Sequence, residues 1–252
     1  MKILVCIKQI NENGEMNRFD EFALEEALKL KEKAGKQKQT PVTPVSVDVI
    51  SAGNLNSFKI IRRAFGMGAD HGLLIVLQNE KKTTEYIPPF TIASLLSAVA
   101  AEMQYDLILT GIMSQDMMHG QTGPMLAELL NFPCATGVVK INFPVNNNSI
   151  QVERELENGF IDCLEIKLPA LLTIQAGINI PRYPSLSNLL AAEQKAIIIR
   201  KETDIFPHSV RAKELFVSME TPEKTRDGLV FEGSLASSVK QLLIFLKKHD
   251  LN

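Results

Sequence analysis

The feature that most constrains this fold is the alternation of short apolar runs with segments of helical periodicity in the first half of the chain. Four runs rich in Val, Ile and Leu each suit one buried strand: residues 2–7, 45–50, 72–77 and 106–110. Segments with helical spacing of apolar residues lie between them, over residues 20–34, 56–65 and 91–103. Such alternation predicts an α/β fold with a Rossmann-like parallel sheet and right-handed crossovers.

The following segments depart from this alternation. Short runs separated by turn residues occupy 135–141, 151–156 and 161–166, which predicts an antiparallel extension of the sheet. The turn between the first two runs is predicted over Val145–Ser149. One more buried strand is predicted over Leu168–Ile174.

The C-terminal quarter is more polar. An extended loop, Pro181–Ser187, precedes a short helix over residues 188–194, and an amphipathic helix is predicted over 234–248. We therefore expect two parts. Residues 1–195 form an α/β domain carrying the loop at about 180–190, and residues 196–252 form an extended arm that docks on a partner.

The stretch Asp106–Pro133 is the main candidate for a binding site. It predicts a buried strand, a polar glycine-bearing loop over Ser114–Gly123, and a helix in which Pro124 suits the first helical position. Backbone N–H groups at a helix N-terminus suit a phosphate, which indicates a nucleotide site. From this stretch alone, an ordinary strand-to-helix turn is an equal alternative.

Composition excludes several classes of function. The net charge of −2 and the absence of Trp disfavour a nucleic-acid partner, and no apolar run reaches the length of a membrane span. The N-terminus does not resemble a signal peptide, so we expect a cytoplasmic or organelle-matrix protein. The three Cys and four His lack metal-ligand spacing, and no catalytic motif is present. These observations favour a binding or carrier subunit over an enzyme.

Several motifs, in order along residues 1 to about 195, resemble the beta subunit of the electron-transfer flavoproteins. They are KILVCIKQI, NRFDEFALEEALKLKE, AFGMGAD, DLILTGIMSQDMMHGQTGPMLAELL, VERELENG, LPALLT and PRYPSLSNLL. The resemblance implies an adenine-nucleotide-binding fold and a heterodimer with an alpha subunit. It also implies AMP in this chain, FAD shared with the alpha subunit, and electron transfer from flavin-dependent dehydrogenases to a quinone-linked acceptor.

The resemblance also implies roles for individual residues. The nucleotide pocket would comprise Cys6, Asn17, Phe19, Asp20, Ala52, Gly111, Asp116, Gly120, Gln121, Thr122 and Gly123. Gln121, Thr122 and the backbone around them would hold the phosphate, and Phe19 would approach the flavin. Leu186, together with Tyr183 and Pro184, would dock the dehydrogenase. Independently, the position of Asp20 before an apolar periodic segment predicts that it caps a helix.

The chain departs from the family pattern at four places. The segment between the first strand and the first helix, Asn11–Met16, is short, and Arg18 replaces a proline. Met117, Met118 and Gly120 replace polar or acidic residues, and residues 191–195 stand where the family often has a lysine-rich run. Two alternatives remain open. One is an electron-bifurcating form with FAD in place of AMP, and the other is a stand-alone adenine-nucleotide-binding regulatory protein. The short segment favours AMP.

Overall fold

The computed structural model describes residues 1–10, 14–36, 44–77, 86–142, 148–206, 214, 217, 218, 220 and 228–249. The chain divides into two compact units, Met1–Leu215 and Phe216–Asn252. The strands are β1 (Lys2–Cys6), β2 (Ser46–Gly53), β3 (His71–Val76), β4 (Leu107–Gly111), β5 (Cys134–Asn142), β6 (Ser149–Glu155), β7 (Ile161–Lys167), β8 (Ala170–Ile174) and β9 (Ile197–Lys201). The helices are α1 (Arg18–Lys36), α2 (Phe58–Met67), α3 (Pro89–Met103), α4 (Thr122–Leu130), α5 (Leu186–Glu193), α6 (Glu202–Ile205) and α7 (Leu235–Lys248), with short 3₁₀ turns η1 (Leu55–Ser57) and η2 (Glu157–Gly159).

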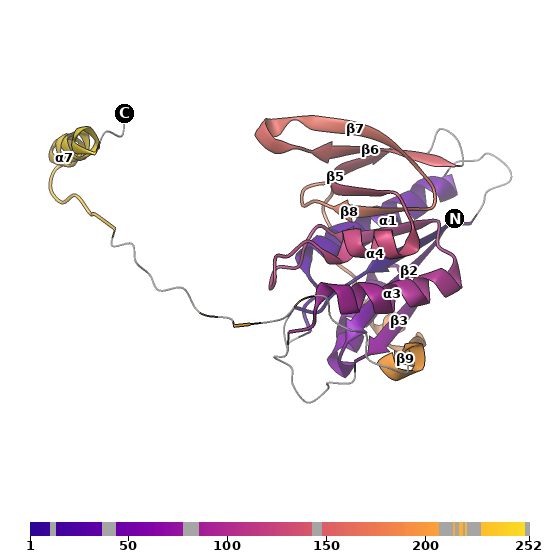
Figure 1. The fold of residues 1–252 in the computed structure, drawn as a ribbon. Helices are drawn as coiled ribbons and strands as arrows, with labels where there is room; N and C mark the ends of the chain where they lie inside the picture. The colour runs from indigo at the N-terminus through magenta and orange to yellow at the C-terminus, as the bar shows by residue number, and fades with distance from the viewer. Residues whose placement is uncertain are drawn as a thin grey trace. The chain divides into compact units, whose positions relative to one another are not determined.

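The described strands form one sheet in the order β7-β6-β5-β8-β4-β1-β2-β3-β9 (Figure 1). Neighbouring strands from β5 to β9 in this order run parallel. Strands β6 and β7 pair antiparallel with each other and with β5 at one edge. The predicted parallel sheet and its antiparallel extension are confirmed.

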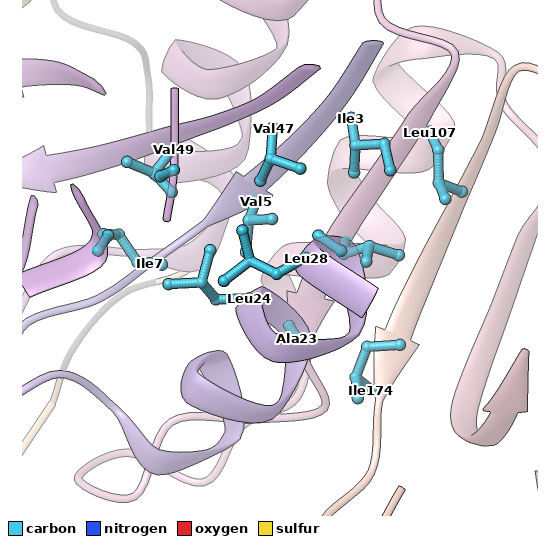
Figure 2. Close-up of a cluster of buried hydrophobic side chains, with 14 of the residues drawn as sticks. Ile3, Val5, Ile7, Ala23, Leu24, Leu28, Val47, Val49, Leu107 and Ile174 are labelled. Carbon is cyan, nitrogen blue, oxygen red and sulfur yellow. The ribbon is translucent and has the colours of Figure 1, made fainter. Parts of the chain in front are cut away.

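Helices cover both faces of the sheet. Helices α3 and α4 lie on the near face in Figure 1 and α1 on the far face. Figure 2 shows Leu24 and Leu28 of α1 against Val5 and Val47 of the two central strands, and all four side chains are buried. Burying side chains of this size contributes about 1.5–3 kcal/mol each. Because both faces are covered, the central strands are continuously apolar, which is why they were visible in the sequence.

Strand order places a topological switch point between β1 and β4. These strands pair directly, but the chain leaves β1 through α1 toward β2 and leaves β4 through α4 toward β5. The two helices cover opposite faces of the sheet. Ligands of open α/β sheets bind outside the carboxyl ends of the strands at such a point.

Three details differ from the sequence-based expectations. Residues 196–252 are expected to form an extended arm, but Ile197–Lys201 pairs with β3 as strand β9 of the sheet. Helix α5 begins at Leu186, so the end of the predicted extended loop is helical, with the Ser185 side chain capping it. Helix α4 begins at Thr122, which places Pro124 within its first turn, where a missing N–H is still tolerated.

Some predicted features lie outside the described residues. These are residues 11–13 of the short segment after β1 and residues 145–147 of the turn predicted over Val145–Ser149. Much of the predicted arm, including residues 207–213 and 221–227, is likewise outside them. Within the part of the chain that is described, no helix combines the length and hydropathy needed to cross a membrane.

The close approach of α2 to β3 yields a stability prediction. A Cβ added at Gly72 would overlap Cγ2 of Ile61 and lie 2.7 Å from Cζ of Phe65. We expect Gly72→Ala to lower the free energy of unfolding by about 1–3 kcal/mol in urea denaturation, as overpacking does. The control is Gly35→Ala, where a Cβ meets nothing within 4 Å; it should be neutral or stabilise by up to about 1 kcal/mol. Equal effects of both substitutions would contradict the packing shown.

Candidate functional site

The candidate site lies where β4, β1 and β2 end side by side. Cys6 is the last residue of β1, Gly111 is the last of β4, and Ala52 is next to last in β2. These strands are neighbours in the sheet and parallel, so the three residues share one edge. We call this edge, with the segments that follow β1 and β4, the switch-point site. The structure therefore gathers residues that are up to 105 positions apart in the sequence.

Asp20 joins the ends of β1 and β4. Its carboxylate accepts the N–H of Lys8 at 2.7 Å and the N–H of Gly111 at 3.0 Å. The side chain is buried, with 5% of the residue exposed, and this burial raises the pKa of Asp20 to about 7 despite the two hydrogen bonds. The predicted capping role is wrong: α1 begins at Arg18, so Asp20 lies inside its first turn and binds strand ends instead.

Asn17 precedes α1 and connects it to the loop after β4. Its side-chain amide donates to the carbonyl of Met113 at 2.9 Å, and its side-chain oxygen accepts the N–H of Gln115 at 3.2 Å. The side chain of Gln115 in turn accepts the N–H of Arg18 at 3.1 Å. Asn17 is 1% exposed, so its side-chain amide cannot bind water. These bonds supply the hydrogen-bond partners without which the buried amide would destabilise the fold.

Gly111 is required by the close approach of α1. A Cβ at this position would lie 2.5 Å from Asp20 Oδ1 and 2.6 Å from Cβ of Phe19. Phe19 itself is half-buried at the start of α1. The structure therefore brings Gly111 against Phe19 and Asp20.

The loop between β4 and α4 is folded back on itself and fastened to the segment after β1. Met118 and Gly120 have positive φ values of 54° and 64°, and a Cβ at Gly120 would lie 3.3 Å from the carbonyl oxygen of Ile112. The Lys8 ammonium lies 2.7 Å from both carboxylate oxygens of Asp116. Sequence reasoning missed Lys8, although a lysine immediately after a predicted strand could have drawn attention to it.

The first two residues of α4, Thr122 and Gly123, carry backbone N–H groups at the positive end of the helix, whereas the third, Pro124, has none. Gln121 precedes the helix and makes no side-chain capping bond. Gly123 is buried against strand ends, since a Cβ there would lie 2.8 Å from Thr110 Oγ1 and 2.7 Å from Thr173 Cγ2. Thr122 is half-buried and Gln121 exposed. Such a helix start can hold a phosphate through its amides.

Two other side chains near the site, His119 and Cys6, interact with other side chains of the chain. His119 is exposed and meets the ring of Tyr86 edge-on, with ring centroids 5.8 Å apart. Cys6 is buried, and burial together with the nearby Asp20 carboxylate raises the pKa of its thiol. A thiol kept protonated in this way is a weak nucleophile.

The expected docking residues divide between surface and core. Tyr183 and Leu186 are 84% and 74% exposed. Pro184 is buried, and a Cβ at Gly66 of α2 would lie 3.0 Å from its Cβ. The structure thus turns Tyr183 and Leu186 outward while Pro184 packs against α2.

Two arginines fix this segment to the helices beneath it. Arg182 forms a two-pronged pair with Glu25 of α1, with nitrogen–oxygen distances of 2.8 and 3.0 Å, and reaches Glu32 at 2.6 Å. The guanidinium of Arg63, from α2, lies 5.0 Å from the ring centroid of Tyr183 and pairs with Glu21 at 2.7 Å. Two-pronged arginine–carboxylate pairs restrict geometry strongly.

A cavity of about 400 Å³ lies elsewhere, along the C-terminal half of α1 and β5. Its lining residues are Glu26, Lys29, Glu32, Lys33, Lys36, Lys140, Ile141, Asn142 and Ile178. Lysines at the end of α1 suit the negative end of the helix dipole. We assign the cavity no ligand, because none of the family-implied residues lies in its lining.

Comparison with known proteins identifies relatives over the whole chain. A model of the electron transfer flavoprotein domain matches residues 5–205. An electron transfer flavoprotein subunit beta from Bacillus subtilis is 30% identical over 98% of this chain and 92% of its own length. Proteins of the same name from Dictyostelium discoideum and, as a mitochondrial form, from Arabidopsis thaliana are each 31% identical, covering 97% and 98% of this chain and 89% and 98% of their own.

The buried Asp20 carboxylate predicts a distinctive pH dependence of stability. Its pKa rises from the ordinary 3.8 to about 7, so between these values the folded chain holds a proton that the unfolded chain has lost. Stability contributed by this group should therefore fall as pH rises from about 4 to about 7, by at most about 1.4 kcal/mol per pH unit. Urea unfolding at pH 5 and pH 7.5 should show this fall in the wild type and a smaller one in Asp20→Asn. Identical pH dependence of the two proteins would contradict the assignment.

Proposed function

This chain belongs to the electron transfer flavoprotein beta subunits, and we propose that it binds AMP at the switch-point site as the small subunit of a heterodimer. In this proposal, electrons from a flavin-dependent dehydrogenase pass through the FAD of the complex to a quinone-linked acceptor. This chain supplies nucleotide binding and docking, without catalytic residues of its own. We further propose a cytoplasmic or organelle-matrix location; the Arabidopsis relative is named as mitochondrial.

The observation that carries the proposal is the convergence of three distant segments at one edge of the sheet. The end of β1, the first turn of α1 and the loop after β4 are joined there through Asp20 and Asn17. The resemblance to the family implies nucleotide contacts in each of these segments. The uncapped start of α4 suits the phosphate of AMP, since its N–H groups are at the positive end of the helix.

Close backbone approach around the site also supports nucleotide binding. Gly120 takes a left-handed conformation and Gly123 lies against Thr110 and Thr173, so both allow backbone to come near a ligand without side chains intervening. Gln121 and Thr122 would add side-chain hydrogen bonds to the phosphate. AMP bound here would stabilise the complex and would not enter the electron path.

The surface around Tyr183 and Leu186 supports a docking role for residues 180–190. Exposed apolar side chains gather there, at Ile180, Tyr183, Leu186 and Leu190. An exposed apolar anchor on a segment held rigid by Arg182 and Arg63 loses little conformational freedom on binding. We propose Leu186 as the anchor for the dehydrogenase.

The C-terminal unit is proposed to dock on the alpha subunit. Helix α7 exposes Leu235, Val239, Leu242, Leu243 and Ile244 by 42–84% each. Apolar residues concentrated on a helix favour burial against a partner. The alpha subunit is the partner that the family name implies.

The nucleotide content of the purified complex tests the proposed function. The chain should be co-expressed with its alpha subunit, and the nucleotides released on denaturation should be identified. We expect FAD together with AMP in a 1:1 ratio. Two FAD and no AMP would identify the electron-bifurcating form. A flavin-free monomer that binds ATP and associates with no flavin-bearing chain would contradict the proposal and support a stand-alone nucleotide-binding protein.

Leu186→Ala tests the docking surface separately. We expect electron transfer from the dehydrogenase to slow by about tenfold or more, as loss of an apolar anchor does, with nucleotide content unchanged. The matched control is Leu129→Ala, on α4, where the leucine is 40% exposed. Stopped-flow reduction of the flavin measures both. Equal rates for the wild type and Leu186→Ala would exclude Leu186 as the anchor.

A further inference from the structure

Both the backbone and the side chain of Lys8 are held by residues of the switch-point site. Lys8 lies two residues beyond β1, and its backbone N–H donates to the carboxylate of Asp20. Its ammonium then reaches the loop after β4, where it lies 2.7 Å from both oxygens of Asp116 and 3.2 Å from Ser114 Oγ. Lys8 therefore joins the two segments that diverge at the switch point.

Three oxygen atoms of the loop after β4 lie around the Lys8 ammonium. A lysine ammonium has three N–H groups, and here three oxygen acceptors lie within 3.2 Å of it. The side chains of Lys8 and Asp116 are 42% and 32% exposed, so the pair is partly shielded from water. The Lys8 ammonium is therefore directed at Ser114 and Asp116.

Asp116 is ionised in the loop that leads to α4, and the positive charge of Lys8 compensates its negative charge. Burial favours the neutral acid, but hydrogen bonds from Lys8 and Ser114 outweigh it and hold the pKa of Asp116 below its usual value. Asp116 Oδ1 also accepts the N–H of Met117 at 2.8 Å. Without Lys8, this loop would carry an uncompensated negative charge close to where an anionic ligand is expected.

We propose that Lys8 is a positioning residue for the nucleotide site: by neutralising Asp116, it keeps the loop before α4 from repelling a phosphate held by the N–H groups at the start of α4. The inference rests on the proposed function, because it assumes that an adenine nucleotide binds at the switch-point site. In this inference, Asp116 contacts Lys8 and the backbone of its own loop and does not contact the nucleotide. The attraction for the phosphate then comes from backbone N–H groups, while the Lys8–Asp116 pair contributes no net charge.

A double-substitution experiment on the complex with the alpha subunit separates this role from direct phosphate binding. AMP affinity should be measured by calorimetry on nucleotide-stripped complex for the wild type, Lys8→Met, Asp116→Asn and Lys8→Met/Asp116→Asn. Lys8→Met should weaken AMP binding about tenfold, as expected for one uncompensated charge near a bound anion. The double variant should recover to within about threefold of the wild type, because the repelling carboxylate is then absent.

Salt and a conservative variant provide further readouts. The loss in Lys8→Met should shrink at high ionic strength, since salt screens the repulsion from Asp116. Lys8→Arg keeps the positive charge and should retain AMP affinity. Thermal unfolding of each complex identifies any variant whose fold has failed.

The outcomes distinguish this inference from the proposed function. Unchanged AMP affinity in Lys8→Met would overturn the role of Lys8 alone. A loss that persists in the double variant would also overturn it, because it would show that Lys8 supports AMP binding in another way than by neutralising Asp116. A wild-type complex that binds no adenine nucleotide would overturn the proposed function, and the inference with it.

Discussion

The arrangement of the site depends on one buried carboxylate. Asp20 accepts the N–H of Lys8, two residues beyond β1, and the N–H of Gly111 at the end of β4, and it lies in the first turn of α1. A buried charge without partners would be strongly destabilising, so the strand ends and α1 must keep their mutual positions. The same proximity explains why position 111 is glycine, because any Cβ there would meet Asp20 Oδ1 at 2.5 Å.

The features that the sequence predicts are those set by residues close together in the chain, and the features it misses are set by residues far apart in it. Parallel strands and helices were predictable because their burial patterns are local and periodic. Asp20 was placed at the right helix but in the wrong role, because an acidic residue near a helix start resembles a cap and its true partners, Lys8 and Gly111, are set by tertiary structure. Lys8 and Asp116 are 108 residues apart, and no spacing rule connects them. Strand β9 was missed because its five residues lie in polar surroundings and pair with a strand 125 residues earlier.

In the proposed nucleotide site, Asp116 is the carboxylate of the loop between β4 and α4, and it is held in an ion pair. Both oxygens of Asp116 are engaged by Lys8, and its neighbours Met117 and Met118 offer no group that transfers protons. A general base must reach the proton it removes, and a carboxylate in a short ion pair is poorly available for that role. The proposed function accordingly assigns no proton transfer to Asp116 and gives the phosphate contacts to backbone groups and to Gln121 and Thr122.

Helix α1 physically connects the proposed nucleotide site with the proposed docking surface. Its first turn carries Asp20, its Glu21 binds Arg63 beside Tyr183, and its Glu25 binds Arg182. The carboxylate of Glu25 is 4% exposed, so removing Arg182 would leave a buried charge unpaired, a loss of about 3–5 kcal/mol. A displacement of α1 at the switch-point site would consequently move Glu21 and Glu25, whose ion pairs hold the segment that carries Leu186. In the proposed function, a nucleotide bound at the switch-point site would therefore restrict the motion of α1 and, through it, of the segment proposed to dock the dehydrogenase.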